Sequence, residues 1–571
     1  MAVEERAGTT ARSIPALWRR AVSSGRTDPA YLVETADGWQ PVSWEEAGRR
    51  VDELAHGFLA LGLRRGDACA ILGNTQLEWV LVNFALARIG VIVVPVYATS
   101  SPADCAYVLR HSESVAVVCE NDEMRERVEG IRAQTQLEHV LVFADLDDLA
   151  ARGREHASTS PGSVEEVERE IGEDDVLTIV YTSGTTGPPK GCVMLHRNYG
   201  SVVEALEQIR LNRPADTVLL FLPLAHTYAQ LVLYCGAGIG FTIALAPDIQ
   251  RVAEAAQEVR PTGMPSVPRV YEKMHAAVTA KFEEATGLER RIVDWALRVG
   301  RRASRLRQEG RSLPPGLAAQ QKLADRLVYS KVKARLGGRL RAGVSGAAPI
   351  AVEILEFFHA LDILVLEGYG LTESASGCSV NREDRFRFGT VGAPLPGIEV
   401  RIADDGEILM RGDNVFAGYY KDEEATRGAL DEDGWLHTGD VGELDADGFL
   451  RITDRKKDII VTAGGKNVAP QNLENELKRL PGISQAVVVG DRRPYLVALV
   501  TVEPGVEDAE GVVRNAVDEV NRRRTRFEQI KRFAVLPHDF SAEREEVTPT
   551  MKLRRDVIVE HFADEIDRLY A

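Results

Sequence analysis

The sequence predicts an α/β protein with a large N-terminal domain and a small C-terminal α/β domain. A chain of 571 residues is longer than one compact core usually fills. Between about residues 30 and 455, short β-branched runs alternate with amphipathic helical stretches. A dense charge cluster, DRKKD at residues 454–458, then precedes an independent α/β pattern. We therefore expect domains at residues 1–455 and 456–571.

The alternation predicts mostly parallel sheets in the first domain, because helical crossovers join parallel strands. The expected strands are ACAIL from Ala68, VIVVPVY from Val91, VAVVC from Val115, HVLVF from His139 and VLTIVYT from Val176. A representative helix begins at Trp44. After the charge cluster, QAVVVGD and YLVALVTV are expected strands, and PQNLENELKRL and residues 512–524 are expected helices.

Composition excludes several classes of protein. No run reaches the roughly 18 apolar residues of a membrane span, and the N-terminal MAVEERAGTTARS lacks the apolar segment of a secretory signal. We therefore expect a cytoplasmic protein. The net charge of −17 argues against nucleic acid as the main partner. Six scattered cysteines, without a CxxC pair or Cys/His cluster, argue against structural zinc and a disulfide framework.

Residues 273–341 stand apart as a basic helical segment, with 17 Lys/Arg and 6 Asp/Glu in an acidic protein. Helical spacing of Ile292, Trp295, Ala296 and Val299 predicts one buried stripe. The simplest interpretation of the charge is a solvated helix face. The alternative is a surface for anionic membrane lipids, giving peripheral membrane association, or for CoA phosphates.

The strongest chemical signal is YTSGTTGPPKG, residues 181–191, which follows an apolar strand. Glycines let backbone amides approach a polyphosphate, hydroxyls add donors, and Lys190 adds positive charge. The spacing is not that of a Walker loop. Pro188 and Pro189 lack amide donors and favour a flap over phosphates rather than a cradle opening a helix. A lone Gly/Ser/Thr run would favour a flexible polar surface loop, but the full eleven-residue string does not.

This string resembles the phosphate-loop signature of the adenylate-forming superfamily, which includes acyl-CoA synthetases, peptide-synthetase adenylation domains and beetle luciferases. Further motifs follow in the family's order over almost the whole chain. The resemblance implies stacked, mostly parallel sheets, a mobile small domain, and ATP phosphates held by Thr182, Ser183, Gly184, Thr185, Thr186, Gly187 and Lys190.

EGYGLTE, residues 367–373, resembles the family's next motif. The resemblance implies that Tyr369, followed by Gly370, stacks on adenine, that Thr372 contacts the α-phosphate side, and that Glu373 holds Mg²⁺ through oxygen. Outside this motif, Glu373 would be read as a surface carboxylate.

The next two motifs concern the ribose and the hinge. In GWLHTGD, the resemblance implies that Asp440 accepts hydrogen bonds from the ribose hydroxyls; alone it would be a turn residue. In DRKKD, Arg455 is implied to reach the ribose and Lys457 to be the hinge of the small domain, whereas Lys456 and Asp458 are expected to be solvated charges.

Lys552, in TPTMKLRR, matches the family's adenylation lysine. A carboxylate attacking an α-phosphate brings like charges together, and a mobile lysine can bridge both. The plain alternative is one more exposed lysine. Rotation of the small domain would then withdraw this lysine and admit the CoA thiol.

Two weaker motifs concern the acyl group. His226, in LPLAHTYAQ, is either a satisfied buried histidine or the wall between the acyl carbonyl and the thiol entry. Gly346 and Ala347, in SGAAP, are expected in a turn that flanks adenine and the acyl chain. Long-chain relatives often have glycine at the position of Ala347, so the extra methyl group leaves the chain length open.

PSVPRVYEKM, the helical insertion after it and SVNREDRFRFGTVGAPLPG resemble the long-chain fatty acyl-CoA synthetase branch. The resemblance implies that a medium- to long-chain fatty acid is joined to coenzyme A, with ATP and Mg²⁺, through an acyl-adenylate. Two alternatives stand: an acyl-AMP ligase that loads a carrier protein, and a non-catalytic fatty-acid or nucleotide-binding protein. A non-catalytic binding protein would not need Lys552, Glu373 and Asp440 together, so their joint presence argues against that alternative.

Overall fold

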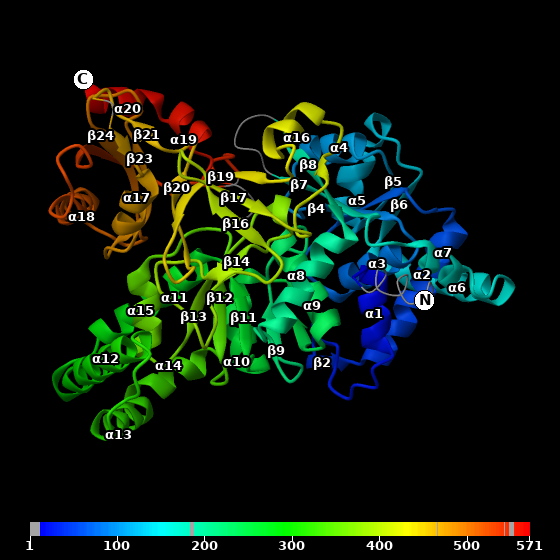
Figure 1. The fold of residues 1–571 in the computed structure, drawn as a ribbon, viewed down its shortest axis with the longest axis horizontal. Coiled ribbons are helices and arrows are strands. Elements are labelled where there is room, and N and C mark those ends of the chain that lie inside the picture. Colours follow the sequence, from blue (N-terminus) through cyan, green and yellow to red (C-terminus); the bar gives the residue numbers. More distant parts are fainter. Residues whose placement is uncertain (1–11, 183–187, 465, 542, 548–552) are drawn as a thin grey trace.

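The computed structural model describes residues 12–182, 188–464, 466–541, 543–547 and 553–571. Figure 1 shows a large N-terminal body and a small C-terminal α/β domain at its edge. Their apolar cores are separate. One large cluster joins both major sheets of the body, a smaller one lies within the seven-stranded half, and two others contain only residues after Ile460 or Ile460 itself. The predicted α/β class with a small C-terminal domain is confirmed.

A seven-stranded sheet forms one half of the body. Its order is β18 (Gly418–Tyr419), β8 (Lys190–Leu195), β7 (Val176–Thr182), β4 (Ile92–Val96), β3 (Ala68–Leu72), β5 (Ser114–Cys119) and β6 (His139–Val142). The strands from β7 to β6 are parallel, and β8 and β18 add antiparallel pairs at one edge. The five strands predicted here all form.

A nine-stranded sheet forms the other half. Its order is β15 (Ala393–Pro394), β14 (Ser379–Val380), β13 (Val365–Tyr369), β12 (Ala342–Ser345), β11 (Gly263–Ser266), β9 (Thr217–Leu220), β10 (Thr242–Leu245), β1 (Tyr31–Thr35) and β2 (Gly38–Val42). The strands from β13 to β1 are parallel. Helices α8 (His196–Gln208) and α9 (Thr227–Ile239) lie between the two sheets (Figure 1). The two sheets therefore share one buried layer.

The remaining helices of the first half cover the sheets or pack between them. They are α1 (Ile14–Val22), α2 (Trp44–Leu61), α3 (Leu77–Arg88), α4 (Pro102–His111), α5 (Asp122–Glu129), α6 (Leu146–Thr159), α7 (Ser163–Glu170) and α10 (Val252–Val259). The predicted helix from Trp44 is α2, which Ser43 caps by accepting a hydrogen bond from the Glu46 amide.

A four-stranded antiparallel sheet of β16 (Glu399–Ile402), β17 (Glu407–Arg411), β19 (Leu436–Leu444) and β20 (Leu450–Arg455) leads to the small domain. The small domain contains β21 (Ile460–Val461), β22 (Asn467–Val468), β23 (Ile483–Val489), β24 (Leu496–Val502) and β25 (Ile530–Val535). Its helices are α17 (Pro470–Lys478), α18 (Ala509–Asn521), α19 (Arg555–His561) and α20 (Ala563–Tyr570).

The basic segment is helical, as predicted. It comprises α11 (Pro268–Glu283), α12 (Gly287–Gln308), α13 (Pro315–Ala324), a π-helical turn (Asp325–Tyr329) and α14 (Ser330–Arg335), and α15 (Val352–Ala360) follows. The buried stripe of α12 contains Ala296 and Val299 but is centred on Val293, Gly300 and Ala303, whereas Ile292 and Trp295 are half-buried. Gly300 is required because an added Cβ would lie 2.0 Å from the Ala360 carbonyl oxygen. Helices α12 and α13 project from the body (Figure 1).

No helix within the described part of the chain is long and apolar enough to cross a membrane.

Candidate active site

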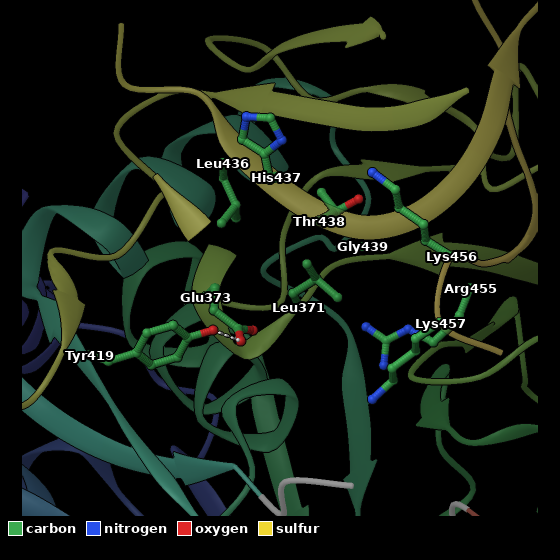
Figure 2. A pocket seen from close by; sticks show the side chains of 10 residues that line it. All are labelled: Leu371, Glu373, Tyr419, Leu436, His437, Thr438, Gly439, Arg455, Lys456 and Lys457. Carbon is green, nitrogen blue, oxygen red and sulfur yellow. Dashed lines mark hydrogen bonds between the residues drawn. The ribbon is translucent and has the colours of Figure 1, made fainter. Parts of the chain in front are cut away.

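A cleft lies where β12 and β13 of one sheet meet β7 and β8 of the other. It consists of an inner cavity of about 350 Å³ and an outer cavity of about 400 Å³ that share five lining residues, Leu371, Glu373, Tyr419, Arg455 and Lys457. Parallel strands commonly present ligand sites at their carboxyl ends. Figure 2 shows the outer cavity between Tyr419 and Glu373 on one side and the Arg455–Lys457 segment on the other.

Most of the predicted site residues that the structure describes line the inner cavity. They are Thr182, Lys190, His226, Gly346, Ala347, Tyr369, Gly370, Thr372, Glu373, Arg455 and Lys457. Asp440 is buried behind the wall and contacts two of them. Ser183, Gly184, Thr185, Thr186, Gly187 and Lys552 lie outside the described residues.

The turn after β13 brings the EGYGLTE residues into the cleft. Thr372–Ser374 form one 3₁₀ turn, and Ala375 and Ser376 end it with positive φ angles of 51° and 57°. This path folds the chain tightly back on Gly370, where an added Cβ would lie 2.2 Å from the Ser376 carbonyl carbon. Only glycine fits at this position, and the motif's glycine is therefore a packing requirement.

Tyr369, Asp440 and Arg455 form one hydrogen-bonded group. The Tyr369 hydroxyl donates to Asp440 Oδ2 at 2.7 Å, and Arg455 Nε donates to Asp440 Oδ1 at 2.8 Å. Burial, reinforced by Asp440, raises the pKa of Tyr369 well above its usual value. Burial lowers the pKa of Arg455, but the interaction with Asp440 has the larger effect, so the pKa of Arg455 is raised overall. Each carboxylate oxygen keeps a further lone pair that can accept a ligand hydroxyl.

Tyr419 is a site residue that sequence reasoning missed. Its hydroxyl donates to Glu373 Oε1 at 2.8 Å, and Lys190 Nζ lies 5.0 Å from the centre of its ring. Burial and the adjacent Glu373 raise the pKa of Tyr419. The only local signal is the aromatic pair in FAGYY, since Tyr419 reaches the cleft by pairing β18 with β8, more than two hundred residues earlier.

Glu373 suits a hard cation that is held mainly by a bound polyphosphate. No group of three or more His, Cys, Asp or Glu among residues 12–182, 188–464, 466–541, 543–547 and 553–571 could form a metal cage. Mg²⁺ commonly takes one or two protein carboxylates together with substrate phosphates and water. The half-buried Glu373 fits that mode, with one oxygen held by Tyr419.

The predicted phosphate loop joins two antiparallel strands. Thr182 at the end of β7 pairs with Lys190 at the start of β8. A strand–loop–helix cradle would place a helix where β8 lies, so the hairpin agrees with the flap interpretation drawn from Pro188 and Pro189. At its base, the Tyr181 hydroxyl is 2.8 Å from His111 Nδ1.

The lining of the inner cavity is mixed, and its aliphatic members include Val202, Leu206, Leu211, Leu231, Val344 and Leu395. His226 is half-buried there, and its Nδ1 accepts a hydrogen bond from the Tyr228 amide at 3.1 Å at the start of α9. Ala347 has a φ of 69°, a left-handed conformation that favours glycine. Its methyl group therefore occupies cavity space at some conformational cost.

The linker residues differ from one another in their surroundings. Lys456 is exposed, as expected, but it is not simply solvated, because its Nζ donates to Asp405 at 2.6 Å and to Glu407 at 3.0 Å. Lys457 faces both cavities, and burial together with Arg455 lowers its pKa. Burial raises the pKa of Asp454 to about 6.

Comparison with known proteins matches both domains. A profile described as AMP-binding enzyme matches residues 18–420, and one described as AMP-binding enzyme C-terminal domain matches residues 457–571. A long-chain-fatty-acid–CoA ligase of Mycobacterium bovis, FadD15, is 38% identical over 95% of each chain. The long-chain-fatty-acid–CoA ligase ACSBG2 of Xenopus laevis is 30% identical over 98% of this chain and 84% of its own.

Among solved structures, ATP-bound MatB from Rhodopseudomonas palustris has a TM-score of 0.74 and covers 97% of this chain and 99% of its own. At 24% identity this likeness shows the fold that the two chains share.

Proposed function

The chain belongs to the AMP-binding enzyme family, and we propose that it joins a medium- to long-chain fatty acid to coenzyme A through an acyl-adenylate, releasing AMP and pyrophosphate. The observation that carries the proposal is one continuous cleft. It combines the Tyr369–Asp440–Arg455 group, the Glu373 carboxylate and several aliphatic lining residues. These features suit a nucleotide at the mouth and an acyl chain within.

In the first half-reaction, a fatty carboxylate attacks the α-phosphorus of ATP and pyrophosphate leaves. Asp440 accepts hydrogen bonds from the ribose, Tyr369 lies against adenine, and Lys190 and Thr182 face the phosphates. Thr372 adds a hydroxyl beside the α-phosphate. Lys552 bridges the two anions as charge develops in the transition state. A Mg²⁺ ion held by Glu373 would neutralise phosphate charge when bound.

In the second half-reaction, the CoA thiol attacks the acyl carbonyl and AMP leaves. We place the domain boundary between residues 455 and 456. The small domain then rotates about Lys457 between the two half-reactions, and this rotation moves Lys552 away from the cleft. His226 would line the path by which the thiol approaches, which agrees with its place on the cavity wall. One cleft can then serve two reactions with different needs.

Two observations support a fatty acid as the acyl substrate. The lining of the inner cavity includes Val202, Leu206, Leu211 and Leu231, aliphatic side chains that suit contact with an alkyl chain. The relatives described above carry the name of long-chain-fatty-acid–CoA ligase. The strained Ala347 methyl narrows the cavity and would set the upper limit of chain length.

The deciding experiment measures AMP and acyl-CoA formation over a panel from acetate to oleate, with amino acids and benzoate added, in the presence and absence of CoA. We expect the highest kcat/KM with acids of about eight carbons or more, and AMP turnover only with CoA. A best substrate that is an amino acid or benzoate would contradict the substrate class. AMP-bound acyl product that transfers to a carrier protein but not to CoA would favour the carrier-loading alternative.

A further inference from the structure

The basic helices that project from the body carry charge of the opposite sign to the rest of the protein. Residues 273–341 have a formal charge of +11, whereas the whole chain has −17. Solvated charges scattered over a protein surface have no reason to segregate in this way. A concentrated positive surface on an acidic protein points to an anionic partner.

The charge on α12 is arranged as a stripe. On an ideal helix Arg291, Arg298, Arg302 and Arg305 fall within about 60° of arc. All four side chains are exposed, and none of them has an ion pair with the residues that the structure describes. They lie opposite the stripe that packs Gly300 against the body. Internal pairing therefore does not explain these arginines.

The neighbouring helix adds exposed apolar side chains. Leu323 on α13 is 50% exposed and Leu327 on the π-helical turn is 41% exposed, one helical turn apart. Lys322 and Arg326 stand beside them, also exposed. Leu288, at the start of α12, is 72% exposed. A soluble polyphosphate or a nucleic acid would give these leucines no partner, whereas a lipid interface accepts both the cations and the leucines.

We propose that α12 and α13 form a docking surface for an anionic lipid bilayer. The arginine stripe binds lipid phosphates, and the exposed leucines enter the headgroup boundary. The projection of both helices from the body keeps the acidic remainder away from the membrane (Figure 1). The surface is separate from the cleft and does not depend on the proposed reaction.

The test is cosedimentation of the full chain with vesicles of phosphatidylglycerol or of phosphatidylcholine in low salt. We expect binding to the anionic vesicles alone, and release at about 0.5 M NaCl, where the Debye length is short. The triple variant R298Q/R302Q/R305Q should bind roughly 100-fold more weakly, since each basic residue near such a surface contributes about fivefold. The variant L323Q/L327Q should also bind more weakly.

The matched control is R152Q/R169Q/R526Q, which removes three exposed arginines elsewhere and changes the net charge equally. We expect it to bind as the wild type does, and all variants to keep the wild-type melting temperature. If the control and the α12 variant lose vesicle binding equally, binding depends on the net charge of the protein and not on this surface, and the proposal is overturned. Wild-type chain that stays in the supernatant with anionic vesicles, or that binds RNA but not vesicles, would overturn it as well.

Discussion

Arg269 on α11 of the large domain reaches across to Ser484 on β23 of the small domain. Its Nη1 donates to the Ser484 carbonyl oxygen at 3.1 Å and its Nη2 to the Ser484 hydroxyl at 3.2 Å, while Asp539 lies 3.9 Å away. The Ser484 hydroxyl in turn donates to Asp539 at 2.7 Å. Arg479 and Glu353 make a second ion pair between the domains. These contacts hold the small domain in the orientation seen here.

Arg269→Ala should loosen that orientation. Hydrogen bonds from a charged donor contribute about 1.5–3 kcal/mol, so we expect trypsin to cut the linker after Arg455, Lys456 or Lys457 roughly tenfold faster. The measurement is limited proteolysis followed by mass spectrometry of the two fragments. Arg290→Ala, which removes a surface arginine on α12, is the control. Equal cleavage rates for both variants would show that the Arg269 contact does not restrain the domains.

Tyr419→Phe should impair use of the metal–nucleotide without removing the ring beneath Lys190. The change deletes only the hydroxyl that donates to Glu373, leaving that carboxylate free to rotate away from the phosphates. We expect KM for ATP to rise and kcat to fall, so that kcat/KM falls about tenfold. The Mg²⁺ concentration needed for half-maximal activity should also rise. Pyrophosphate release at varied Mg²⁺ measures both.

Tyr420→Phe is the matched control for that change, because the Tyr420 hydroxyl reaches the surface residue Glu113 at 3.3 Å. If the two variants lose activity to the same extent, the bond between Tyr419 and Glu373 has no special part in catalysis.

Asp440→Asn should abolish discrimination between ATP and its 2′- and 3′-deoxy analogues. The wild-type carboxylate is held by Tyr369 and Arg455, which leaves lone pairs toward the ribose. The amide keeps the shape but loses the charge and part of the acceptor capacity. We expect kcat/KM for ATP to fall about 10–100-fold and that for the deoxy analogues to fall less. An equal fall in kcat/KM for all three nucleotides would mean that Asp440 supports the folded structure and does not contact the ribose hydroxyls.

Several of the predicted residues lie together in the cleft because each local motif holds its residues on one short segment of chain. Tyr369 ends strand β13, Gly370, Thr372 and Glu373 follow directly, and all four line the same cavity. The expected strands also formed, since apolar β-branched runs bounded by turns have few other solutions. These signals lie within about ten residues of chain.

The contacts that escaped prediction are all long-range. Tyr419 depends on strand β18 joining β8, and Arg269 depends on how two domains pack. Lys456 could be judged exposed from its charge, but its two carboxylate partners lie about fifty residues earlier, in the turn before β17 and at the start of that strand. The buried stripe of α12 was shifted because Gly300 and Ala303 allow close packing that hydrophobicity alone does not reveal.

Glu367→Gln should change the pH dependence of stability. The carboxyl of Glu367, on β13, is buried and its Oε2 lacks a hydrogen-bond partner within the described chain, so burial raises its pKa to about 8. The unfolded carboxyl has a pKa of about 4.3, so folding takes up a proton between these values. The protonated form therefore contributes stability that is fully present below about pH 4.3 and lost progressively as pH rises to about 8.

Glutamine mimics the protonated carboxyl at every pH. We expect the melting temperature of Glu367→Gln, relative to wild type, to rise between pH 5 and pH 8 and to stay constant above, with a gain of roughly 2 °C or more. Glu356→Gln, on the exposed face of α15, is the control and should follow the wild-type curve. A pH-independent offset would mean that Glu367 is already ionised in the folded protein.

Lys552→Ala tests whether the two half-reactions use different residues. If this lysine bridges carboxylate and α-phosphate only in the first step, its removal should slow fatty-acid-dependent pyrophosphate release by about 10²–10³-fold. The same variant, supplied with presynthesised acyl-AMP and CoA, should form acyl-CoA at close to the wild-type rate. Lys531→Ala, which removes an exposed lysine of β25, controls for a loss of charge in the small domain. Equal slowing of both half-reactions in Lys552→Ala would mean that the lysine serves the whole cycle, and rotation of the small domain would then not be needed to exchange one set of residues for another.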